Sequence, residues 1–591
     1  MRSSLRRLAA LGLCLVGLAT PARGQGLTGQ MSGSVTDGSS SVLPGATVTV
    51  TNMGTQAARS VTTDASGVFT VTELLAGRYE VTVTLEGFKT YVQRDVQLSA
   101  NERVALRAIV LEVGTVAETV SVQAEAARVQ TLSGERSGVI TQDQINDIAL
   151  KGKDYMGLLK QLPGVVDTQN REAPGWNNLG GLSINGGRNN TINLTYDGVT
   201  NLDTGSNTGP FLAPGIDSIA EVKVLTSNYQ AEYGRSSGGT INVITKSGTR
   251  EFHGGGFYSK RNEDFNANEW QNNKFGRAKP PYRFEYGGYH LGGPVALGGF
   301  NQGRSKLFFF WNQEILSRTN PGTLERRTMP SELERRGDFS QSLDTNGRLI
   351  VVRDPQTGQP FPGNIIPAGR IDANGQALLN LFPIPNANDR AATGGQYNYT
   401  FQSAYDQPRT DQVVRVDWNV APKTLFYSRV NFGYEAYKGG WGFVLNNANW
   451  PQLPIAYEIH SYGVVNTLLH TFSPTTVLEV TVGVNHGKQT VKPLTDADLT
   501  RNDRTQVGLT GLPQFFPDAN PSRIVPNANF TAAGLALANL PQLGVEGRYP
   551  FFGENDIWNS SVNLTKVMGS HNVKAGLFYD CLLYTSPSPR D

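Results

Sequence analysis

The most informative segment of the 591-residue chain reads Ala231-Glu-Tyr-Gly-Arg-Ser-Ser-Gly-Gly-Thr-Ile-Asn-Val-Ile-Thr-Lys246. Its glycines favour a tight turn, because glycine adopts backbone conformations that other residues avoid. The run from Thr240 to Thr245 is rich in β-branched residues and is typical of a buried strand. Ser247-Gly248-Thr249 then marks another turn. The segment therefore predicts a glycine-rich turn that leads into a strand, with a new structural unit beginning near residue 251.

The same segment contains Gly234-Arg-Ser-Ser-Gly238, which fits the Gly-x-Ser-x-Gly pattern of hydrolases. In a hydrolase this motif lies between a strand and a helix, and a histidine and an acid follow it along the chain. Here a strand is predicted after the motif, so the glycines are better explained as turn residues. We therefore expect no catalytic residues and no enzyme activity.

Short motifs of similar character precede this segment: Leu182-Ser-Ile-Asn-Gly-Gly-Arg188, Ile192-Asn-Leu-Thr-Tyr-Asp-Gly-Val199 and Ile219-Ala-Glu-Val-Lys-Val224. A helix is predicted from Thr141 to Leu162, because Thr141 and Gln144 form a capping-box pattern and apolar residues recur at helical spacing up to Pro163-Gly164. The Asp-Gly pair at 197–198 predicts a tight turn that would place Gly198 at positive φ.

Together these motifs resemble the plug domain of TonB-dependent receptors, and the resemblance covers residues 113–250. It implies an α+β plug domain inside an outer-membrane barrel. The residues to which it gives a structural role in the plug are Gly186, Gly187, Asp197, Gly198, Tyr233, Gly234, Gly238 and Gly239.

Residues 27–112 contain short β-rich runs at regular spacing, which predict a small sandwich. In Tyr79-Glu-Val-Thr-Val-Thr-Leu85 every second side chain is apolar, so one face can be buried against a second sheet. The expected strands are Gly33 to Asp37, Ala46 to Thr51, Val68 to Thr72, Tyr79 to Leu85, Thr90 to Leu98 and Arg103 to Leu111.

Motifs such as Gly33-Ser-Val-Thr-Asp37 and Leu75-Ala-Gly-Arg-Tyr79 resemble the carboxypeptidase regulatory-like family. This resemblance implies an accessory module with an immunoglobulin- or transthyretin-like sandwich. The segment contains no histidine, so a zinc protease is not expected.

Residues 251–580 show long alternating runs joined by tight turns. In Val414-Arg-Val-Asp-Trp-Asn-Val420 one face is apolar and the other is polar, as an outer-membrane strand requires. Short turns alternate with long excursions, notably Ser317 to Arg409 and Gly487 to Asn555, which is expected for periplasmic turns and extracellular loops. This part predicts a partial transmembrane antiparallel β-barrel, so the fold class is mainly β. The aromatic cluster Phe308-Phe-Phe-Trp311 is expected to supply lipid-facing and interfacial side chains rather than core.

The excursion from Ser317 to Arg409 contains Gly337-Asp-Phe-Ser340, Pro360-Phe-Pro-Gly-Asn364 and Leu381-Phe-Pro-Ile-Pro-Asn386. These motifs resemble the extracellular loop of the Oar-like branch of TonB-dependent receptors. The resemblance implies an outer-membrane location in a Gram-negative bacterium, and contact with membrane lipid follows from that location.

Residues 1–24 are typical of a signal peptide, with Arg2, Arg6 and Arg7 before an apolar run from Leu8 to Leu18. Cleavage is expected before Gln25. Residues 581–591 do not continue the pattern before them and resemble translated sequencing adapter, so the natural reading frame is expected to be cut near residue 580. Residues 251–580 contain about nine predicted strands, whereas plugged outer-membrane transporters have about 22. The barrel is therefore expected to be incomplete.

The run Glu118-Thr-Val-Ser-Val122 fits the pattern of a TonB box, the extended segment that such receptors offer as an added strand to the energy-coupling protein. The candidate residues are Glu118, Thr119, Val120, Ser121 and Val122. The same β-prone composition suits a first strand of the plug. The sequence leaves both interpretations open.

Composition excludes several other classes of function. The chain has 52 Lys and Arg against 50 Asp and Glu, with no basic stripe, so nucleic acid is not an expected partner. The six histidines lack the spacing of a zinc site, and neither a metal nor a cofactor is expected.

Two functions remain open. The resemblance implies a receptor-transporter that binds an unknown extracellular ligand with its outer loops and imports it through TonB. The rival is a structural or adhesive Oar-like outer-membrane protein without solute transport. Nothing in the sequence specifies the ligand.

Overall fold

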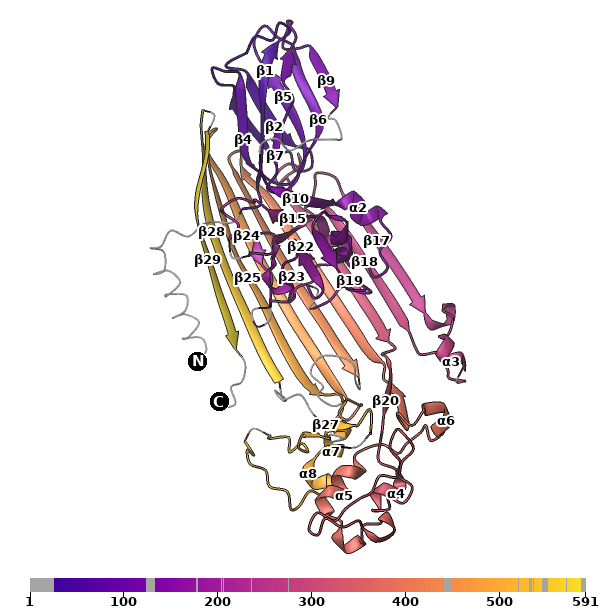
Figure 1. Ribbon diagram of the computed structural model, residues 1–591. Helices are drawn as coiled ribbons and strands as arrows, with labels where there is room; N and C mark the ends of the chain where they lie inside the picture. The colour runs from indigo at the N-terminus through magenta and orange to yellow at the C-terminus, as the bar shows by residue number, and fades with distance from the viewer. Residues whose placement is uncertain are drawn as a thin grey trace.

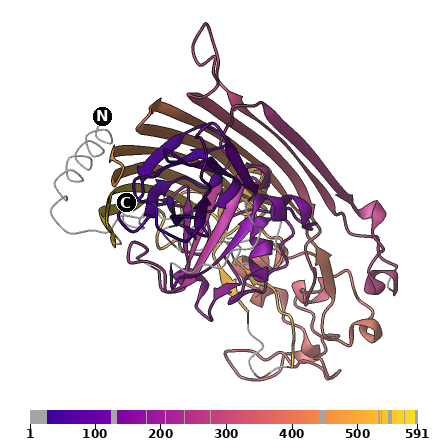
Figure 2. The same cartoon turned by 90° about the horizontal axis from the view of Figure 1, so that it is seen from above.

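The computed structural model describes residues 26–123, 133–176, 179–203, 205, 207–234, 236–274, 276–439, 449–518, 520–530, 534, 536–544, 551–569 and 571–585. These residues form a sandwich, a plug and a long antiparallel wall (Figure 1). Figure 2 looks down on the sandwich and shows the wall curving around the other two units. The predicted signal peptide lies outside the described residues.

The sandwich consists of two sheets. One contains β4, β1 and β7, with β8 also paired to β1, and the other has the order β3-β2-β5-β6-β9. Valines at alternate positions of β2 and β5, such as Val48, Val50, Val81 and Val83, are fully buried between the sheets. The strands are β1 (Gly29–Asp37), β2 (Thr47–Asn52), β3 (Ala58–Thr62), β4 (Val68–Leu74), β5 (Gly77–Thr84), β6 (Thr90–Leu98), β7 (Arg103–Ala105), β8 (Ile109–Leu111) and β9 (Thr119–Gln123).

The sandwich was predicted correctly, with two differences in its strands. β3 was not predicted, because Ala58-Arg-Ser-Val-Thr62 carries only one large apolar residue. The run from Arg103 to Leu111 is two short strands rather than one, since β7 and β8 pair with successive parts of β1. Beyond the predicted end of the sandwich at residue 112, β9 joins the same sheet as β6 and contains most of the predicted TonB box.

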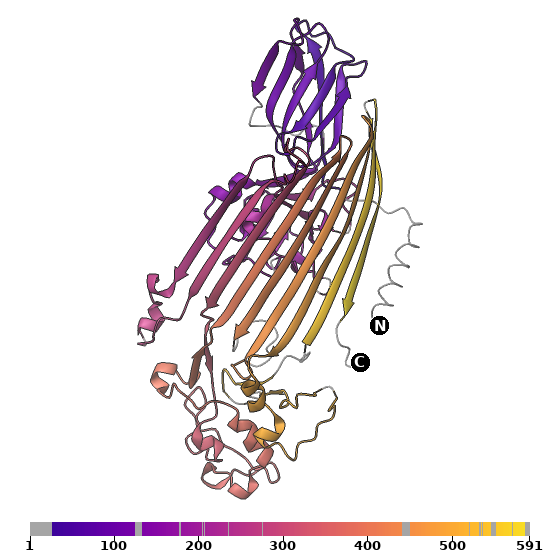
Figure 3. The same ribbon diagram turned by 180° about the vertical axis from the view of Figure 1, so that it is seen from behind.

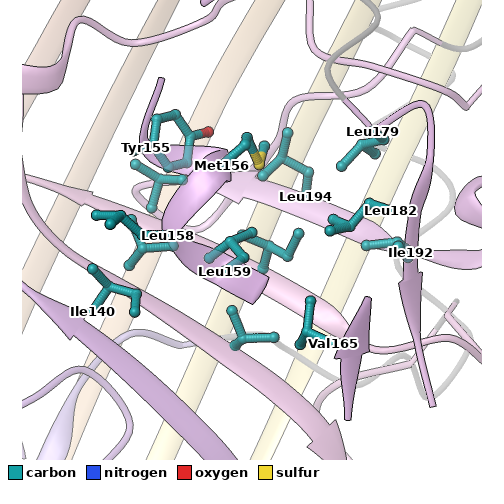
Figure 4. Close-up of a cluster of buried hydrophobic side chains, with 14 of the residues drawn as sticks. Ile140, Tyr155, Met156, Leu158, Leu159, Val165, Leu179, Leu182, Ile192 and Leu194 are labelled. Carbon is teal, nitrogen blue, oxygen red and sulfur yellow. The ribbon is translucent and has the colours of Figure 1, made fainter. Parts of the chain in front are cut away.

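The plug is built on a sheet with the order β10-β15-β16-β13-β14. Its core gathers apolar side chains from the sheet and from a short 3-10 helix, including Ile140, Leu158, Leu159 and Leu194 (Figure 4). The elements are β10 (Arg136–Thr141), α2 (Gln142–Asp147), η1 (Tyr155–Gln161), β11 (Val165–Asp167), β12 (Leu182–Ile184), η2 (Asn189–Thr191), β13 (Asn193–Tyr196), β14 (Val199–Thr200), η3 (Ile216–Ser218), β15 (Ile219–Ser227) and β16 (Thr240–Thr245).

The prediction of one helix from Thr141 to Leu162 is wrong in its middle. The capping box of Thr141 and Gln144 is present and starts α2. The chain leaves the helix at Ile148, whose backbone is extended, and a new 3-10 helix, η1, begins after Lys153 (φ of 51°) with Asp154 as its cap. Lys151-Gly-Lys153 therefore separates two short helices whose apolar residues share one core.

The wall is a nine-stranded antiparallel sheet in sequence order, as predicted. Its strands are β17 (His253–Asn262), β18 (Arg283–Pro294), β19 (Leu307–Asn320), β22 (Tyr405–Ala421), β23 (Thr424–Gly439), β24 (Ile455–Ser473), β25 (Thr476–Pro493), β28 (Phe551–Met568) and β29 (His571–Thr585). β29 continues through Cys581, five residues beyond the predicted end of the natural sequence.

The two faces of the wall differ as a membrane strand requires. Arg415 and Asp417 face the plug and are buried, whereas the flanking residues Val414 and Trp418 are 37% and 42% exposed. Exposed apolar side chains recur on neighbouring strands of the outer face, and exposed apolar patches of this kind mark protein or membrane interaction surfaces. Among them are Ile315, Phe432, Tyr462, Val482, Trp558 and Val562. Figure 3 shows the wall from behind, on the side away from the plug.

The cluster Phe308-Phe-Phe-Trp311 was expected to face lipid or the membrane interface, and this is wrong for two of its four residues. Phe308 and Phe310 are fully buried on the plug side, whereas Phe309 and Trp311 are only partly buried. Successive residues of a strand point to opposite faces, so four consecutive aromatic residues cannot all face lipid.

The short and long connections lie at opposite ends of the wall (Figure 1). The sandwich sits at the end with short turns, where the Asn419 amide donates to the Thr55 carbonyl oxygen at 2.9 Å and the Asn572 amide donates to Gln30 at 2.7 Å. Outer-membrane barrels keep short turns on the periplasmic side. This convention places the sandwich in the periplasm and the long connections outside the cell.

Within the described residues, no helix is both long and apolar enough to cross a membrane.

The long connections pack into one cap with shared apolar cores. Met329, Phe382, Trp450 and Leu543 come from three different connections and form one buried cluster. The Trp450 indole N–H donates to the Gln542 carbonyl oxygen at 2.7 Å. The cap elements are β20 (Leu324–Arg327), α4 (Glu332–Arg335), η5 (Pro362–Asn364), η6 (Ala368–Arg370), α5 (Ala373–Asn380), α6 (Arg390–Thr393), β21 (Tyr399–Gln402), α7 (Asp496–Arg501), α8 (Arg504–Val507), β26 (Ala528–Asn529) and β27 (Gln542–Leu543). Between β17 and β18 lie η4 (Glu263–Phe265) and α3 (Trp270–Lys274).

The lipid-facing assignment predicts effects of different size for arginine substitutions at two exposed valines. Val482 lies on the outer face of β25 and is 46% exposed, whereas Val113 lies on the sandwich and is 79% exposed. Val482→Arg should cost about 2–4 kcal/mol if the side chain lies near the bilayer midplane, and Val113→Arg should cost less than about 0.5 kcal/mol. Recovery of each variant in urea-washed outer membranes measures the difference. Equal recovery of both variants would contradict the assignment.

Candidate functional site: the contact between plug and wall

The predicted Asp-Gly turn is one of the parts of the plug that contact the wall. Asp197 and Gly198 have φ values of 48° and 82°, so both adopt the left-handed conformation. They join β13 to β14, with Tyr196 paired to Val199. Positive φ at both central residues is the signature of a type I′ hairpin turn. The prediction of a tight turn with Gly198 at positive φ is confirmed.

Asp197 links this turn to the glycine-rich motif of residues 231–246. Its carboxylate accepts from the backbone N–H of Thr245 at 2.9 Å and from the Thr245 hydroxyl at 2.8 Å. Its own N–H donates to the Val243 carbonyl oxygen at 2.9 Å. The two most informative motifs of the sequence therefore meet at one carboxylate.

The same carboxylate forms ion pairs with the wall. Arg429 Nε lies 2.9 Å from Asp197 Oδ2, and Arg415 Nη1 lies 4.0 Å from Oδ1. Arg415 also pairs with Asp417 at 2.7 Å. The Arg429 guanidinium stacks on the Tyr196 ring at 3.9 Å and donates to the Tyr196 carbonyl oxygen at 3.0 Å. All four charged side chains are less than a tenth exposed.

The charges of this group balance, because two aspartates face two arginines. A buried pair repays its desolvation only when its geometry and hydrogen bonds are good, whereas removal of one partner costs about 3–5 kcal/mol. The group therefore specifies where the plug sits more than it adds net stability. We refer to Asp197, Arg415, Asp417 and Arg429 as the charged seat.

A second contact holds the plug segment before η3. The N–H of Gly215 donates to Asp411 at 3.0 Å, and the N–H of Asp217 donates to Glu314 at 2.9 Å. Arg409 donates to the Ala213 carbonyl oxygen. A Cβ on Gly215 would lie 2.4 Å from the Glu314 carboxylate, so any larger residue there would displace this carboxylate from its contact with Asp217.

Glycines in the wall make room for apolar side chains of the plug. A Cβ on Gly483 would lie 2.4 Å from Val199, one on Gly487 would lie 2.2 Å from Phe211, and one on Gly463 would lie 2.7 Å from Leu212. Real Cβ atoms do not approach other atoms this closely. The plug is therefore seated by shape as well as by charge.

The other predicted plug residues lie around the glycine-rich turn. Gly186 has a φ of 77° and follows Asn185 in a tight turn closed by the Gly187 N–H on Ile184. A Cβ on Gly187 would lie 3.4 Å from the Cα of Gly238, which brings these two predicted residues together.

Tyr233, Gly239 and Gly234 each have an environment of their own. Tyr233 is buried and donates to the Gly26 carbonyl oxygen at 2.8 Å. Gly239 has a φ of 113°. Gly234 is different, because nothing lies within 4 Å of the Cβ position and its φ is not positive. The structure gives no reason for glycine at 234.

The candidate TonB box lies outside the plug sheet. Thr119 to Gln123 form β9, which pairs in parallel with β6 of the sandwich, from Thr90↔Thr119 to Arg94↔Gln123. The plug sheet begins instead with β10. Of the two interpretations left open, a first strand of the plug is therefore wrong, and a role as TonB box stays a prediction.

The residues of the wall that contact the plug were not identified from the sequence. Arg415 was placed on the polar face of its strand, but nothing indicated its partner. Arg429 lies at a polar position of an alternating strand and is fully buried. A charged residue on the inner face of a membrane strand requires a partner, which is the signal that could have drawn attention to both arginines.

Comparisons with known proteins agree with this architecture. Residues 244–587 match the family described as "Outer membrane beta barrel domain". Residues 30–112 match "Carboxypeptidase regulatory-like domain", and residues 130–241 match "TonB-dependent Receptor Plug Domain". The resemblances to the carboxypeptidase regulatory-like family and to the plug domain of TonB-dependent receptors, and the prediction of an outer-membrane barrel, are confirmed.

One curated relative is the "TonB-dependent transporter Oar" of Myxococcus xanthus, with 32% identity over 216 residues, which is 36% of this chain and 19% of that protein. The chain thus spans about a fifth of this relative's length. Among solved structures, the outer membrane transporter YddB from Escherichia coli aligns over 76% of this chain and 48% of its own, with 13% identity and a TM-score of 0.42. The FrpB iron transporter from Neisseria meningitidis aligns over 77% and 60%, with 10% identity and a TM-score of 0.38.

The turn at the charged seat predicts a contrast between two glycines. Gly198→Val should destabilise the plug by about 1–3 kcal/mol, because a β-branched residue is strained at positive φ. Gly234→Val is the matched control and should change stability by less than about 0.5 kcal/mol. Hydrogen–deuterium exchange of residues 193–200 in the detergent-solubilised chain reports the local opening. Faster exchange in neither variant, or in both equally, would contradict the assignment.

Proposed function

The chain belongs to the outer-membrane β-barrel family, and we propose that it acts as a TonB-dependent receptor-transporter. In this proposal the cap binds an extracellular ligand, the plug closes the path through the membrane, and the energy-coupling protein displaces the plug from the periplasm. The proposal rests on the observation that buried contacts hold the plug against the inner face of the wall.

The way in which the plug is held supports transport. Its contacts with the wall include ion pairs and hydrogen bonds to backbone groups, beside an apolar cluster in which Phe211 and Trp176 of the plug pack against Tyr457 of the wall. Ion pairs and hydrogen bonds of this kind can be replaced by water when the plug moves. A purely structural or adhesive role requires no such removable body inside the wall, so we prefer transport to adhesion.

The cap provides space for a ligand. A cavity of about 690 Å³ opens among its connections and is lined by apolar residues such as Met329, Leu379 and Phe382 together with polar ones such as Asn398. This volume is within the range of small-molecule sites, about 300–1,000 Å³. The chemical identity of the ligand is not specified by these residues.

The coupling partner is a TonB-type protein, and its contact is the segment Glu118–Val122. The segment lies at the periplasmic end, and its residues Thr119 to Val122 are extended in β9, the edge strand of a sheet. An exposed edge strand is a template for strand addition by another protein.

Replacement of Glu118–Val122 by Gly-Ser-Gly-Ser-Gly at the chromosomal locus tests the proposal. This change keeps the chain length but removes the preference for an extended strand. We expect a compound that wild-type cells remove from the medium to remain there with this variant, as measured by untargeted mass spectrometry of spent medium. The double variant Val120→Ile/Val122→Ile retains the strand preference and should take up the compound normally.

The rival function gives a different outcome. If no compound depends on Glu118–Val122, while cell-surface adhesion is lost when the whole protein is deleted, the receptor-transporter proposal is wrong.

A further inference from the structure

The sandwich holds the candidate TonB box in a defined position. β9 continues the sheet β3-β2-β5-β6 as its last strand, and five residue pairs connect it to β6. β6 and β9 run parallel, and the chain between them crosses to the other sheet through β7 and β8. The box is thus already extended before any partner arrives.

A small set of contacts fixes the start of this pairing. Lys89 Nζ lies 3.3 Å from both Glu112 and Glu118, and these two carboxylates raise the pKa of Lys89. The Thr90 N–H donates to the Glu118 carbonyl oxygen at 2.7 Å, and the Thr90 hydroxyl donates to the Val116 carbonyl oxygen at 2.7 Å. These contacts set the register of β9 although its side chains are mostly exposed.

The other edge of β9 is open. Among the described residues the sheet ends at β9, and Thr119, Ser121 and Val122 are exposed. In a parallel strand, backbone groups of successive residues point alternately to the two neighbours. Since the Glu118 carbonyl points to β6, the N–H and C=O groups of Thr119 and Ser121 point to the open edge.

We propose that the sandwich presents the box in place, so that a strand of the TonB-type protein adds to the open edge of β9 while β9 stays paired with β6. The accessory module then acts as a platform for the coupling protein. A strand that is already extended loses less entropy on binding than a free segment. The proposal rests on the proposed function, because it assumes that Glu118–Val122 is the contact of the coupling protein.

The alternative is that β6 sequesters the box and that β9 must leave the sandwich to bind. A reversible cross-link between the two strands separates these possibilities. Val92 and Ser121 are direct partners in the register. Paired strands lie about 4.8 Å apart, within the Cα separation of about 4.4–6.8 Å that a disulfide requires.

The experiment uses the full chain with Val92→Cys and Ser121→Cys in a Cys581→Ser background, solubilised in detergent. The probe is the purified periplasmic domain of the TonB protein from the same bacterium, and Kd is measured with and without reductant. If the box is presented in place, the oxidised and reduced forms should bind within about threefold of each other. Binding at least about tenfold weaker in the oxidised form, with recovery on reduction, would overturn the proposal.

Backbone variants give a second, independent readout. Ser121→Pro removes an N–H that points to the open edge, so it should weaken binding of the probe at least about tenfold, whereas Ser121→Ala should not. Unchanged binding by Ser121→Pro would overturn addition at the open edge.

The experiments distinguish failure of the proposed function from failure of the proposal that the sandwich presents the box in place. If the Gly-Ser-Gly-Ser-Gly variant binds the probe as well as the wild type, or if the wild type does not bind, Glu118–Val122 is not the coupling contact. Both proposals then fall together, regardless of the cross-link.

Discussion

The buried pairing of Asp197 with Arg429 is the interaction on which the arrangement of plug and wall depends. Asp197 can reach Arg429 only because Asp197 and Gly198 turn the chain at positive φ. The same carboxylate receives the N–H of Thr245, at the end of the glycine-rich motif. The Asp197 side chain thus contacts both plug motifs and the wall. A buried charge without a partner would be costly. The plug therefore adopts the position in which Asp197 and Arg429 pair with each other.

The membrane explains why the wall has two different faces. Lipid cannot satisfy polar groups, so charged side chains of the wall strands, such as Arg415 and Asp411, point inward to the plug. The plug supplies their partners through its backbone and through Asp197. Gly463, Gly483 and Gly487 complete the fit by leaving space for apolar side chains. The position of the plug is therefore specified both by polar contacts and by the space that these glycines leave.

Much of the fold could be predicted from local patterns. Alternation along Tyr79 to Leu85 and Val414 to Val420 identified both faces of the sandwich and wall strands, and the Asp-Gly pair identified the turn at 197–198. Local patterns failed where tertiary pairing decides the outcome. The helix from Thr141 ends at Asp147 instead of continuing to Leu162, and four consecutive aromatic residues divide between two faces. The partners of Arg429 and the pairing of β9 with β6 join residues far apart in sequence, so no local signal could reveal them.

A double-mutant cycle on the charged seat tests most directly whether the plug is positioned by a charge contact with the wall. Asp197→Asn, Arg429→Met and the double variant are compared by the opening free energy of Thr240–Thr245 amides, from hydrogen exchange of the detergent-solubilised chain. The account predicts that each single variant is destabilised and that the double variant is less destabilised than the sum, with a coupling of at least about 1 kcal/mol. Effects that add to within about 0.3–0.5 kcal/mol would show that the two side chains do not act together.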